Sequence, residues 1–288
     1  MATPLVIKSS ARPDAKYIRA IIFGGPNKGK SLALCTADKP VCLLTELTCA
    51  GSFARDVIEG AFGVPKDEDI ANWLKSKNAK ITPEEIKKAL TVDRDVTLKL
   101  MTGITYDMPT LNIEDFTHLA QAIEILKTGQ FDTAMIDSGS MLSRLLLEHF
   151  KAHGGKGGKP LADPRQAYKK AADSTLDFIR DLFKLPIHIF ITAHAAERSI
   201  NKGTEDEPIW IKYYVPAFEG NVLGREIPHM IREIWSAQIE GKYDNGRPKH
   251  VLRTRKKETD DYERTLCPRF LDEEPVDLAV MTRKWLNK

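Results

Sequence analysis

Four short apolar runs recur along the chain, at residues 17–23, 41–45, 131–136 and 187–192, and helical stretches separate them. Each run ends in polar residues. Continuous apolar runs are typical of strands buried in a parallel sheet, and their alternation with helices predicts an α/β fold with helices on both faces of the sheet. Ligands of such sheets bind beyond the carboxyl ends of the strands. The residues that follow each run are therefore the candidate site residues.

Directly after the first run, residues 24–31 read G-G-P-N-K-G-K-S and match the P-loop pattern G-x-x-x-x-G-K-[ST]. Gly24 and Gly29 let the backbone curl so that successive N–H groups point at phosphate, and a helix expected to start near Gly29 adds its positive end. Lys30 would contact the β- and γ-phosphates, and the Ser31 hydroxyl would hold Mg²⁺. The nucleotide-contacting residues that we expect are Gly24, Gly25, Pro26, Asn27, Lys28, Gly29, Lys30, Ser31 and Leu32.

The later runs end in polar candidates of their own. Glu46 follows the second run, Asp137 follows the third, and His194 lies just after the fourth. The sequence Thr-Ala-Met-Ile-Asp at 133–137 is a Walker B pattern, whose carboxylate would hold the Mg²⁺ shell. A lone acid at a strand end is more often a helix cap than a catalyst, so a cap is the alternative for Glu46 taken alone.

This ordered set of a P-loop, a strand ending in Glu46, a strand ending in Asp137-Ser138 and a strand ending at His194 resembles the core of RecA-type ATPases. The resemblance implies binding and hydrolysis of Mg-ATP, with Glu46 as the general base that polarises the attacking water. It also implies that His194 senses the γ-phosphate and couples it to a DNA-binding loop beyond. RecA proteins usually carry Gln at that position, so His194 departs from the pattern.

A narrower resemblance, carried by short motifs, is to phage-encoded nucleotide-binding proteins related to RecA, some of which are single-strand annealing recombinases. Its motifs are Y-V-P-A-F-E-G at 214–220, then L-G-R at 223–225 with an apolar helix expected to reach Trp235, and the segments 252–257 and 275–278 before a final helix. In ring- or filament-forming relatives, basic residues at this stage reach the γ-phosphate of the neighbouring subunit. Arg255 and Lys257, expected on one side of a strand, are the catalytic candidates for that contact. A solvated charge run is the alternative.

Two further segments are candidates for single-stranded DNA binding. Residues 151–166 are rich in Gly and Lys, and they follow the expected Walker B strand and helix, where RecA-like proteins place their first DNA-binding loop. Residues 195–214 interleave basic and aromatic side chains, which suits contact with phosphates and stacking on bases. A plain surface linker and core aromatics are the alternatives. The nucleic-acid candidates are Lys156, Lys159, Arg198, Lys202, Trp210 and Tyr213.

Residues 60–115 depart from a minimal core and predict an insertion of small helices packed on the sheet edge. One helix of this insertion is expected near 83–90, capped by Thr82 ahead of Pro83 and Glu85. The insertion precedes a further helix expected at 114–127. A solvated helical insert and a platform for substrate or partner are both open. We expect an N-terminal extension at 1–16 and one RecA-like ATPase domain at 17–288.

The composition limits the remaining choices. A length of 288 residues suits one large α/β domain, and a net charge of +3 is too small to indicate nucleic-acid binding by itself. The four Cys form no C-x-x-C pair, so we expect reduced thiols, no zinc site and a cytoplasmic protein, in the host cytoplasm if phage-encoded. No signal-peptide or membrane-span pattern occurs, so no membrane partner is expected.

The sequence therefore predicts a RecA-like P-loop NTPase with a mainly parallel central sheet flanked by helices and a small helical insertion. Its cofactors would be ATP and Mg²⁺, and its function would be phage-type recombination on single-stranded DNA, by annealing or strand exchange. We expect a homo-oligomer, ring or filament, and a single-strand-binding protein as a possible partner. A ring-forming motor or helicase, a small-molecule kinase and a nucleotide-regulated scaffold are the alternatives.

Overall fold

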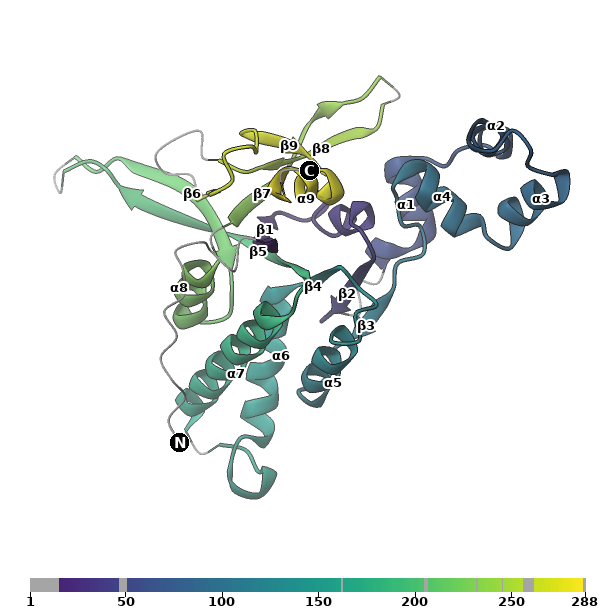
Figure 1. The fold of residues 1–288 in the computed structure, drawn as a ribbon. Coiled ribbons are helices and arrows are strands. Elements are labelled where there is room, and N and C mark those ends of the chain that lie inside the picture. The colour runs from purple at the N-terminus through teal and green to yellow at the C-terminus, as the bar shows by residue number, and fades with distance from the viewer. Residues whose placement is uncertain are drawn as a thin grey trace, which may run out of the picture.

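The computed structural model describes residues 16–46, 51–161, 163–204, 207–231, 233–244, 246–255 and 262–286. The strands of the described part are β1 (Arg19–Gly24), β2 (Pro40–Leu44), β3 (Thr110–Asn112), β4 (Thr133–Asp137), β5 (His188–Asn201), β6 (Trp210–Ala217), β7 (Glu233–Lys242), β8 (Pro248–Arg253) and β9 (Glu273–Pro275). They form one sheet in the order β3-β2-β4-β5-β1-β7-β8-β9, and β6 pairs with β5 off this path (Figure 1). The four predicted strands are confirmed as β1, β2, β4 and β5.

The central part of the sheet is parallel, since β1 pairs in parallel with β5 and β7, and β4 pairs in parallel with β2 and β5. The carboxyl ends of β1, β2, β4 and β5 therefore meet at one edge. The P-loop strand β1 and the Walker B strand β4 are separated by β5 alone, so residues at the end of β5 lie between the two motifs.

Side chains of β1 alternate between two core layers. Ile21 and Phe23 pack with the helices of one face, whereas Ala20 and Ile22 pack on the other face with the short helix that follows the P-loop. The first face is covered by α5 (Thr117–Leu126), α6 (Gly139–His153), α7 (Pro164–Lys184) and α8 (Asn221–Met230), and the second by the 3₁₀ helix Ser31–Thr36 and α9 (Leu278–Leu286). This arrangement confirms the predicted RecA-like P-loop NTPase fold.

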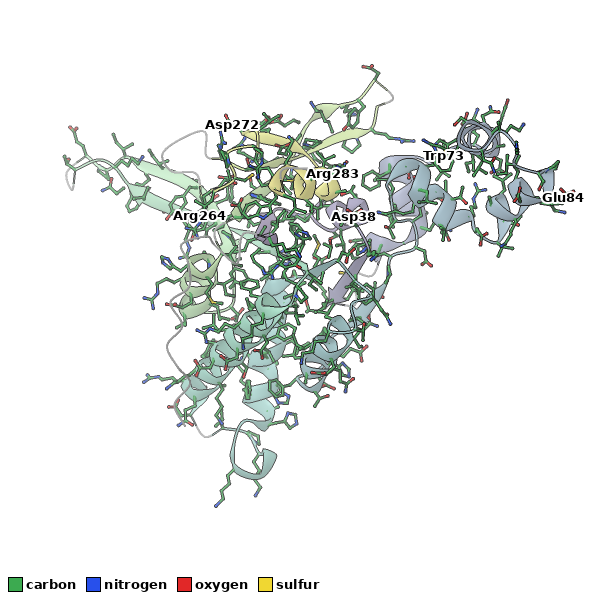
Figure 2. The ribbon with its side chains drawn as sticks, in the orientation of Figure 1. Asp38, Trp73, Glu84, Arg264, Asp272 and Arg283 are labelled. Carbon is green, nitrogen blue, oxygen red and sulfur yellow. The ribbon has the colours of Figure 1, made fainter. Side chains whose placement is uncertain are left out.

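Between β2 and β3 lies a set of short helices that we call the helical lobe, residues 51–106. Its helices are α1 (Arg55–Phe62), α2 (Asp67–Lys77), α3 (Pro83–Thr91) and α4 (Arg94–Thr102). Ile58, Ile70 and Leu98 anchor the lobe in the second core layer, but α3 buries no residue. The lobe projects from the sheet, and Figure 2 places Trp73 and Glu84 on it, far from Arg264 and Asp272. Its origin as an insertion stays a prediction.

The predicted helix at 83–90 is confirmed together with its cap. The Thr82 hydroxyl accepts the Glu85 N–H at 3.2 Å, the Glu85 carboxylate accepts the Thr82 N–H at 2.8 Å, and Pro83 occupies the first turn. This reciprocal capping box satisfies two N–H groups that have no partner within the helix. The helix expected at 114–127 is α5. The predicted extension at 1–16 lies outside the described residues, apart from Lys16.

Two expectations about the later chain are wrong. The segment after His194 is not a loop, because β5 continues to Asn201 and pairs antiparallel with β6 to form a long hairpin that projects from the sheet (Figure 1). The helix expected to reach Trp235 ends at Met230, and Trp235 lies fully buried in β7. The apolar residues around Trp235 belong to β7, which pairs with β1. They are buried between the two core layers, and such burial favours a strand. No helix of the described residues is long and apolar enough to cross a membrane.

Candidate functional site: a nucleotide edge and a projecting hairpin

The turn after β1 has a backbone that requires glycine at its first and sixth positions. Gly24 has φ 154° and Gly29 has φ 87°, in the region that side chains disfavour. A Cβ on Gly24 would lie 2.8 Å from the Ala237 carbonyl oxygen, and one on Gly29 would lie 2.8 Å from the His250 Nδ1. Pro26 and Asn27, at the tip of the turn, are exposed. The turn therefore presents backbone to solvent while β7 and β8 pack closely behind it.

The helix expected after the P-loop is shorter than predicted. Residues Ser31–Thr36 form a single 3₁₀ segment, and Ala37 returns to an extended conformation. So short a segment has only a small dipole, so phosphate binding here depends on the turn's N–H groups and on Lys30. The Lys30 ammonium lies inside the turn and donates to the carbonyl oxygens of Gly24 at 3.0 Å and Gly25 at 2.7 Å.

Ser31 and Asp137, from opposite sides of β5, meet at the same edge. The Ser31 hydroxyl donates to Asp137 Oδ2 at 2.5 Å, and the Thr192 hydroxyl of β5 donates to Asp137 Oδ1 at 2.5 Å. The Asp137 side chain is only 2% exposed. Mg²⁺ prefers oxygen ligands and is often held by one or two carboxylates together with phosphates. Ser31 and Asp137 supply such oxygens, so these residues fit the ion that the sequence predicts.

Glu46 follows the end of β2, the strand that pairs with β4 up to Asp137. Thr45, the residue before it, donates its N–H to the Asp137 carbonyl at 3.1 Å, and its hydroxyl is bonded to both the carbonyl and the N–H of Ser138. These contacts fix the end of β2 against the end of β4. The half-buried Glu46 therefore stands at the same edge as Ser31 and Asp137, where a general base would be required.

His194 stands next to the P-loop rather than at the end of its strand. It pairs in register with Gly24 on one side and Ala217 of β6 on the other. Its N–H donates to the Ser140 hydroxyl at 3.0 Å, and that hydroxyl in turn donates to the Ala217 carbonyl. Ser140 belongs to the first turn of α6, directly after Asp137. The base of the hairpin thus pairs with the P-loop strand and is hydrogen-bonded to the helix that follows the Walker B strand.

Comparison with known proteins identifies the family of the chain. Residues 72–261, about two thirds of the chain, match the AAA domain family AAA_24. The chain belongs to this family. Among solved structures, a KaiC-like protein of the hyperthermophilic archaeon Pyrococcus horikoshii is similar at 12% identity and a TM-score of 0.39, over 89% of this chain and 84% of that one. The comparison with curated proteins found no match.

In this AAA-family chain the matched range includes Asp137 and the whole β5–β6 hairpin, while the P-loop lies before it. Family and fold together are those of P-loop ATPases. The roles of the individual residues are predictions that neither finding tests.

The β5–β6 hairpin separates the predicted DNA-binding residues onto two faces. Residues directly opposite in an antiparallel pair share a face, so Arg198 lies beside Tyr213 on one face, while Trp210 and Lys212 lie on the other. Trp210 is 64% exposed, and Tyr214, on the same face, is 55% exposed. Trp210 and Tyr213 therefore cannot stack on bases along one continuous face.

Charge on the Trp210 face is partly compensated. Lys212 Nζ lies 2.8 Å from Glu197 Oε1, and this contact raises the pKa of Lys212. The Tyr214 hydroxyl is 3.5 Å from Glu197 Oε2. Lys202, also predicted to bind DNA, follows the end of β5 near the hairpin tip, where its N–H donates to the Ile209 carbonyl at 2.9 Å.

The Gly-rich loop lies elsewhere. Lys156 and Lys159 belong to the turn between α6 and α7, at the bottom of Figure 1, whereas the hairpin projects at the upper left. At about 1.5 Å per residue, the 15-residue helix α6 separates this turn from Asp137 by about 22 Å. The structure therefore does not bring the two predicted DNA-binding segments together.

The predicted cross-subunit contact also changes. Strand β8 ends at Arg253, so Arg255 lies beyond the strand on which it was expected, and Lys257 lies outside the described residues. β8 runs antiparallel to β7 and carries the chain away from the P-loop edge. Arg255 is tied within its own chain, 3.4 Å from Asp272 Oδ1 and 3.3 Å from the Pro268 carbonyl.

Sequence reasoning missed three residues at these sites. Thr192 was missed because it lies at the end of an apolar run and was interpreted as part of a buried strand. Only the strand order shows that its hydroxyl reaches Asp137. Tyr214 would have been found by period-two alternation with Trp210, had 210–217 been interpreted as a strand. His250 belongs to a segment expected to be a strand, but only the strand order shows that it packs against Gly29.

Proposed function

We propose that this chain hydrolyses Mg-ATP and couples its nucleotide state to single-stranded DNA bound along the β5–β6 hairpin, in phage-type recombination by annealing or strand exchange. One observation carries the proposal: a single strand, β5, borders the nucleotide edge and then continues into a hairpin that exposes aromatic side chains. Nucleotide and DNA would then act on two ends of one element.

The exposed face of the hairpin suits a single strand better than a duplex. Trp210 and Tyr214 are four residues apart on one strand face, about 13 Å at the usual rise, with Lys212 between them. Aromatic side chains stack on any base and are therefore tolerant of sequence. Because Glu197 compensates Lys212, we expect stacking to contribute more than charge on this face.

Coupling would pass through the base of the hairpin. ATP phosphates would replace the carbonyl oxygens of Gly24 and Gly25 as partners of Lys30, and the turn would adjust. Gly24 pairs with His194, and Ser140 joins His194 to the start of α6 after Asp137. A change at the phosphates would thus reach both strands of the hairpin within one or two hydrogen bonds.

At the nucleotide edge each residue would have a separate role. Ser31 and Asp137 would hold Mg²⁺, which offsets the charge on the transferring phosphoryl group. Lys30 would contact the phosphates, and Glu46 would accept a proton from the attacking water. Assembly into a ring or filament on DNA is part of the proposal, because a single hairpin contacts only a few nucleotides.

The test measures ATP turnover and DNA binding of the same variants. The parent should hydrolyse ATP faster with a single-stranded oligonucleotide, and Trp210→Ala should weaken oligonucleotide binding by about 1–3 kcal/mol if a base stacks there. Tyr168→Ala on α7, also an exposed aromatic at 45%, is the matched control and should bind as the parent does. Fluorescence anisotropy of a labelled oligonucleotide gives the affinities.

A double Lys156→Ala, Lys159→Ala variant decides whether the Gly-rich loop also contacts DNA. If it does, binding weakens equally for all sequences and its salt dependence flattens, because fewer counterions are released. Parental affinity and salt slope would remove the loop from the DNA site. The proposed coupling would be overturned if the oligonucleotide did not change the rate of ATP turnover and Trp210→Ala bound the oligonucleotide with parental affinity. Efficient strand unwinding would favour a motor instead.

A further inference from the structure

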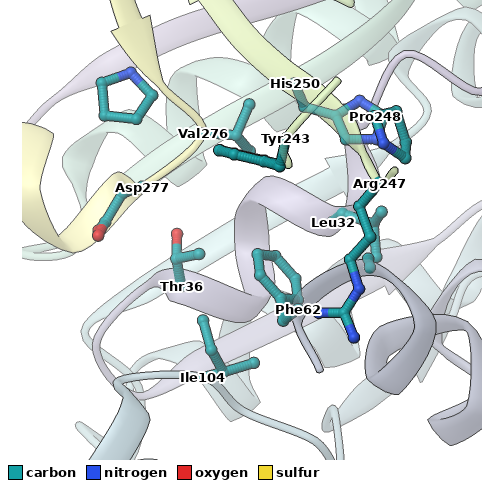
Figure 3. A pocket seen from close by; sticks show the side chains of 12 residues that line it. Leu32, Thr36, Phe62, Ile104, Tyr243, Arg247, Pro248, His250, Val276 and Asp277 are labelled. Atoms are coloured by element: carbon teal, nitrogen blue, oxygen red, sulfur yellow. The ribbon is translucent and has the colours of Figure 1, made fainter. Parts of the chain in front are cut away.

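A cavity of about 380 Å³ opens beside the 3₁₀ helix that follows the P-loop (Figure 3). Four separate parts of the chain line it, and one of them is the segment 275–277 at the end of β9. Leu32 comes from the 3₁₀ helix, Phe62 and Ile104 come from the helical lobe, and Tyr243, Arg247 and His250 come from the hairpin of β7 and β8. The volume is within the range of small-molecule sites, about 300–1,000 Å³.

The cavity begins where the phosphate site ends. Leu32 directly follows Ser31, and His250 packs so closely on Gly29 that a Cβ there would lie 2.8 Å from Nδ1. A nucleotide whose phosphates lie on the turn at 24–31 could therefore extend its base into this space. The β5–β6 hairpin contributes no residue to the cavity, so the space is distinct from the proposed DNA-binding face.

The cavity wall suits a flat aromatic ring with polar edges. Phe62 and Tyr243 lie on opposite sides of the space in Figure 3, and Leu32 and Ile104 add apolar surface. His250 Nδ1 is buried and has no hydrogen-bond partner among the described residues. Buried polar atoms are nearly always paired. This nitrogen lies against Gly29, so the His250 ring joins the cavity wall to the P-loop.

The helical lobe is held at this same point. A second cavity lies next to the first and shares Phe62, Ile104 and Arg247 with it. The Arg247 guanidinium packs against Gly63, and the Tyr106 hydroxyl donates to the Gly63 carbonyl at 2.6 Å. The end of α1 and the tip of the β7–β8 hairpin therefore meet at the cavity.

We propose that this cavity receives the purine base of the nucleoside triphosphate, held between Phe62 and Tyr243, with Arg247 and His250 at its polar edge. The proposal rests on the proposed function, since it assumes that the turn at 24–31 binds the phosphates. It also explains why the helical lobe lies here, because the lobe forms one wall of the base site and the β7–β8 hairpin forms the other. Base binding would then clamp the lobe to the core.

The test compares two probes by isothermal titration calorimetry with Mg²⁺ present: a non-hydrolysable ATP analogue, and inorganic tripolyphosphate, which has no base. Tyr243→Ala should weaken the analogue roughly 5- to 100-fold, the usual range for loss of a base stack, and leave tripolyphosphate unchanged. Tyr243→Phe should bind both probes as the parent does. Since Tyr243 is 52% exposed, its replacement should leave the fold intact, which circular dichroism would check.

Controls separate this proposal from the function on which it rests. Lys30→Ala should weaken both probes, and Tyr168→Ala should weaken neither. Parental affinity for the analogue in both Tyr243→Ala and Arg247→Gln would overturn the base site while leaving the ATPase intact. A parent that binds neither probe would overturn the proposed function itself. A uniform loss for both probes in Tyr243→Ala would also overturn the base site, because a base contact cannot affect a ligand without a base.

Discussion

The inner and outer halves of β5 are continuous in sequence but different in environment. From His188 to Ala193 every residue is buried, whereas from His194 to Asn201 every residue is at least partly exposed. The inner half pairs with β1 and β4 and is covered on both faces, while the outer half pairs with β6. The change occurs at the level of Gly24. The nucleotide edge is thus the boundary between the packed core and a projecting ribbon.

This difference predicts different local stabilities. Two-stranded ribbons are only marginally stable in water by themselves, while strands inside a packed parallel sheet open only with the whole domain. The outer half of β5 can therefore change its position without unfolding the inner half. Such independence is what a DNA-responsive element next to a fixed nucleotide site requires.

The largest expected effect is on stability and uses two isoleucines of this one strand. Ile191 is fully buried and lies against Gly139, whereas Ile200 is 44% exposed. Ile191→Ala should lower the free energy of unfolding by about 2–5 kcal/mol, because the tightly packed site cannot close over the cavity. Ile200→Ala should cost about 0.5 kcal/mol or less. Urea unfolding followed by circular dichroism measures both.

Equal losses in the two variants would contradict the division of β5 into core and ribbon. Amide hydrogen exchange sharpens the same comparison in the parent. Amides of the inner half should exchange only with global unfolding, and those of the outer half through local opening.

The inner half was predictable from the sequence and the outer half was not, for a physical reason. The run Ile187–Thr192 is apolar because both faces of the strand are buried. The outer segment has no regular hydrophobic pattern, because Glu197, Arg198 and Ser199 follow one another. Both faces of a projecting ribbon are exposed to solvent, so polar side chains can stand at any position. Pairing with β6 then decides the structure, and pairing depends on residues that are distant in sequence.

The candidate site divides in the same way. The P-loop and Asp137 follow from motifs whose spacing is local, and the fold brings them together as expected. The arrangement of Thr192, Tyr214 and His250 depends on which strands are neighbours. The short 3₁₀ segment after the P-loop, in place of a longer helix, was likewise not visible in its apolar residues, which suit either structure.

The next effect concerns catalysis and compares two hydroxyl groups of β5. Thr192 donates to Asp137 in the buried half, whereas Ser199 is exposed in the outer half. Thr192→Val keeps the side-chain shape but removes a hydrogen bond to a charged group, a loss of about 1.5–3 kcal/mol. ATP turnover without DNA should fall at least about tenfold, and more Mg²⁺ should be needed for half-maximal rate. Ser199→Ala should match the parent in both.

Steady-state rates over a Mg²⁺ titration separate the outcomes. Parental turnover and Mg²⁺ dependence in a folded Thr192→Val protein would show that the contact with Asp137 is only structural. If Ser199→Ala lowered ATP turnover as much as Thr192→Val does, the residues needed for catalysis would extend into the outer half of β5.

The smallest effect is a pH dependence that arises at the inner end of β5. His188 is 7% exposed, and its Nδ1 accepts the Ile18 N–H at 3.0 Å. Burial, and to a lesser degree the nearby Arg19 charge, lowers the pKa of His188 to about 4. Because this pKa lies below the unfolded value of about 6.5, the unfolded chain binds the proton more tightly. The stabilisation is complete above pH 6.5 and is lost as the pH falls toward 4.

Between pH 7 and pH 5 the parent should therefore lose about 1–2 kcal/mol of unfolding free energy through His188. His188→Asn, whose amide oxygen can still accept the Ile18 N–H, lacks this titration. Urea unfolding of both proteins at pH 8, 7, 6 and 5 isolates the histidine, because all other groups titrate in both. The difference between parent and variant should stay constant from pH 8 to pH 7 and then shift toward the variant by about 1–2 kcal/mol at pH 5. If the difference in unfolding free energy between parent and variant stayed constant down to pH 5, His188 would be solvated in the folded protein. The buried part of β5 would then begin only at Ile189.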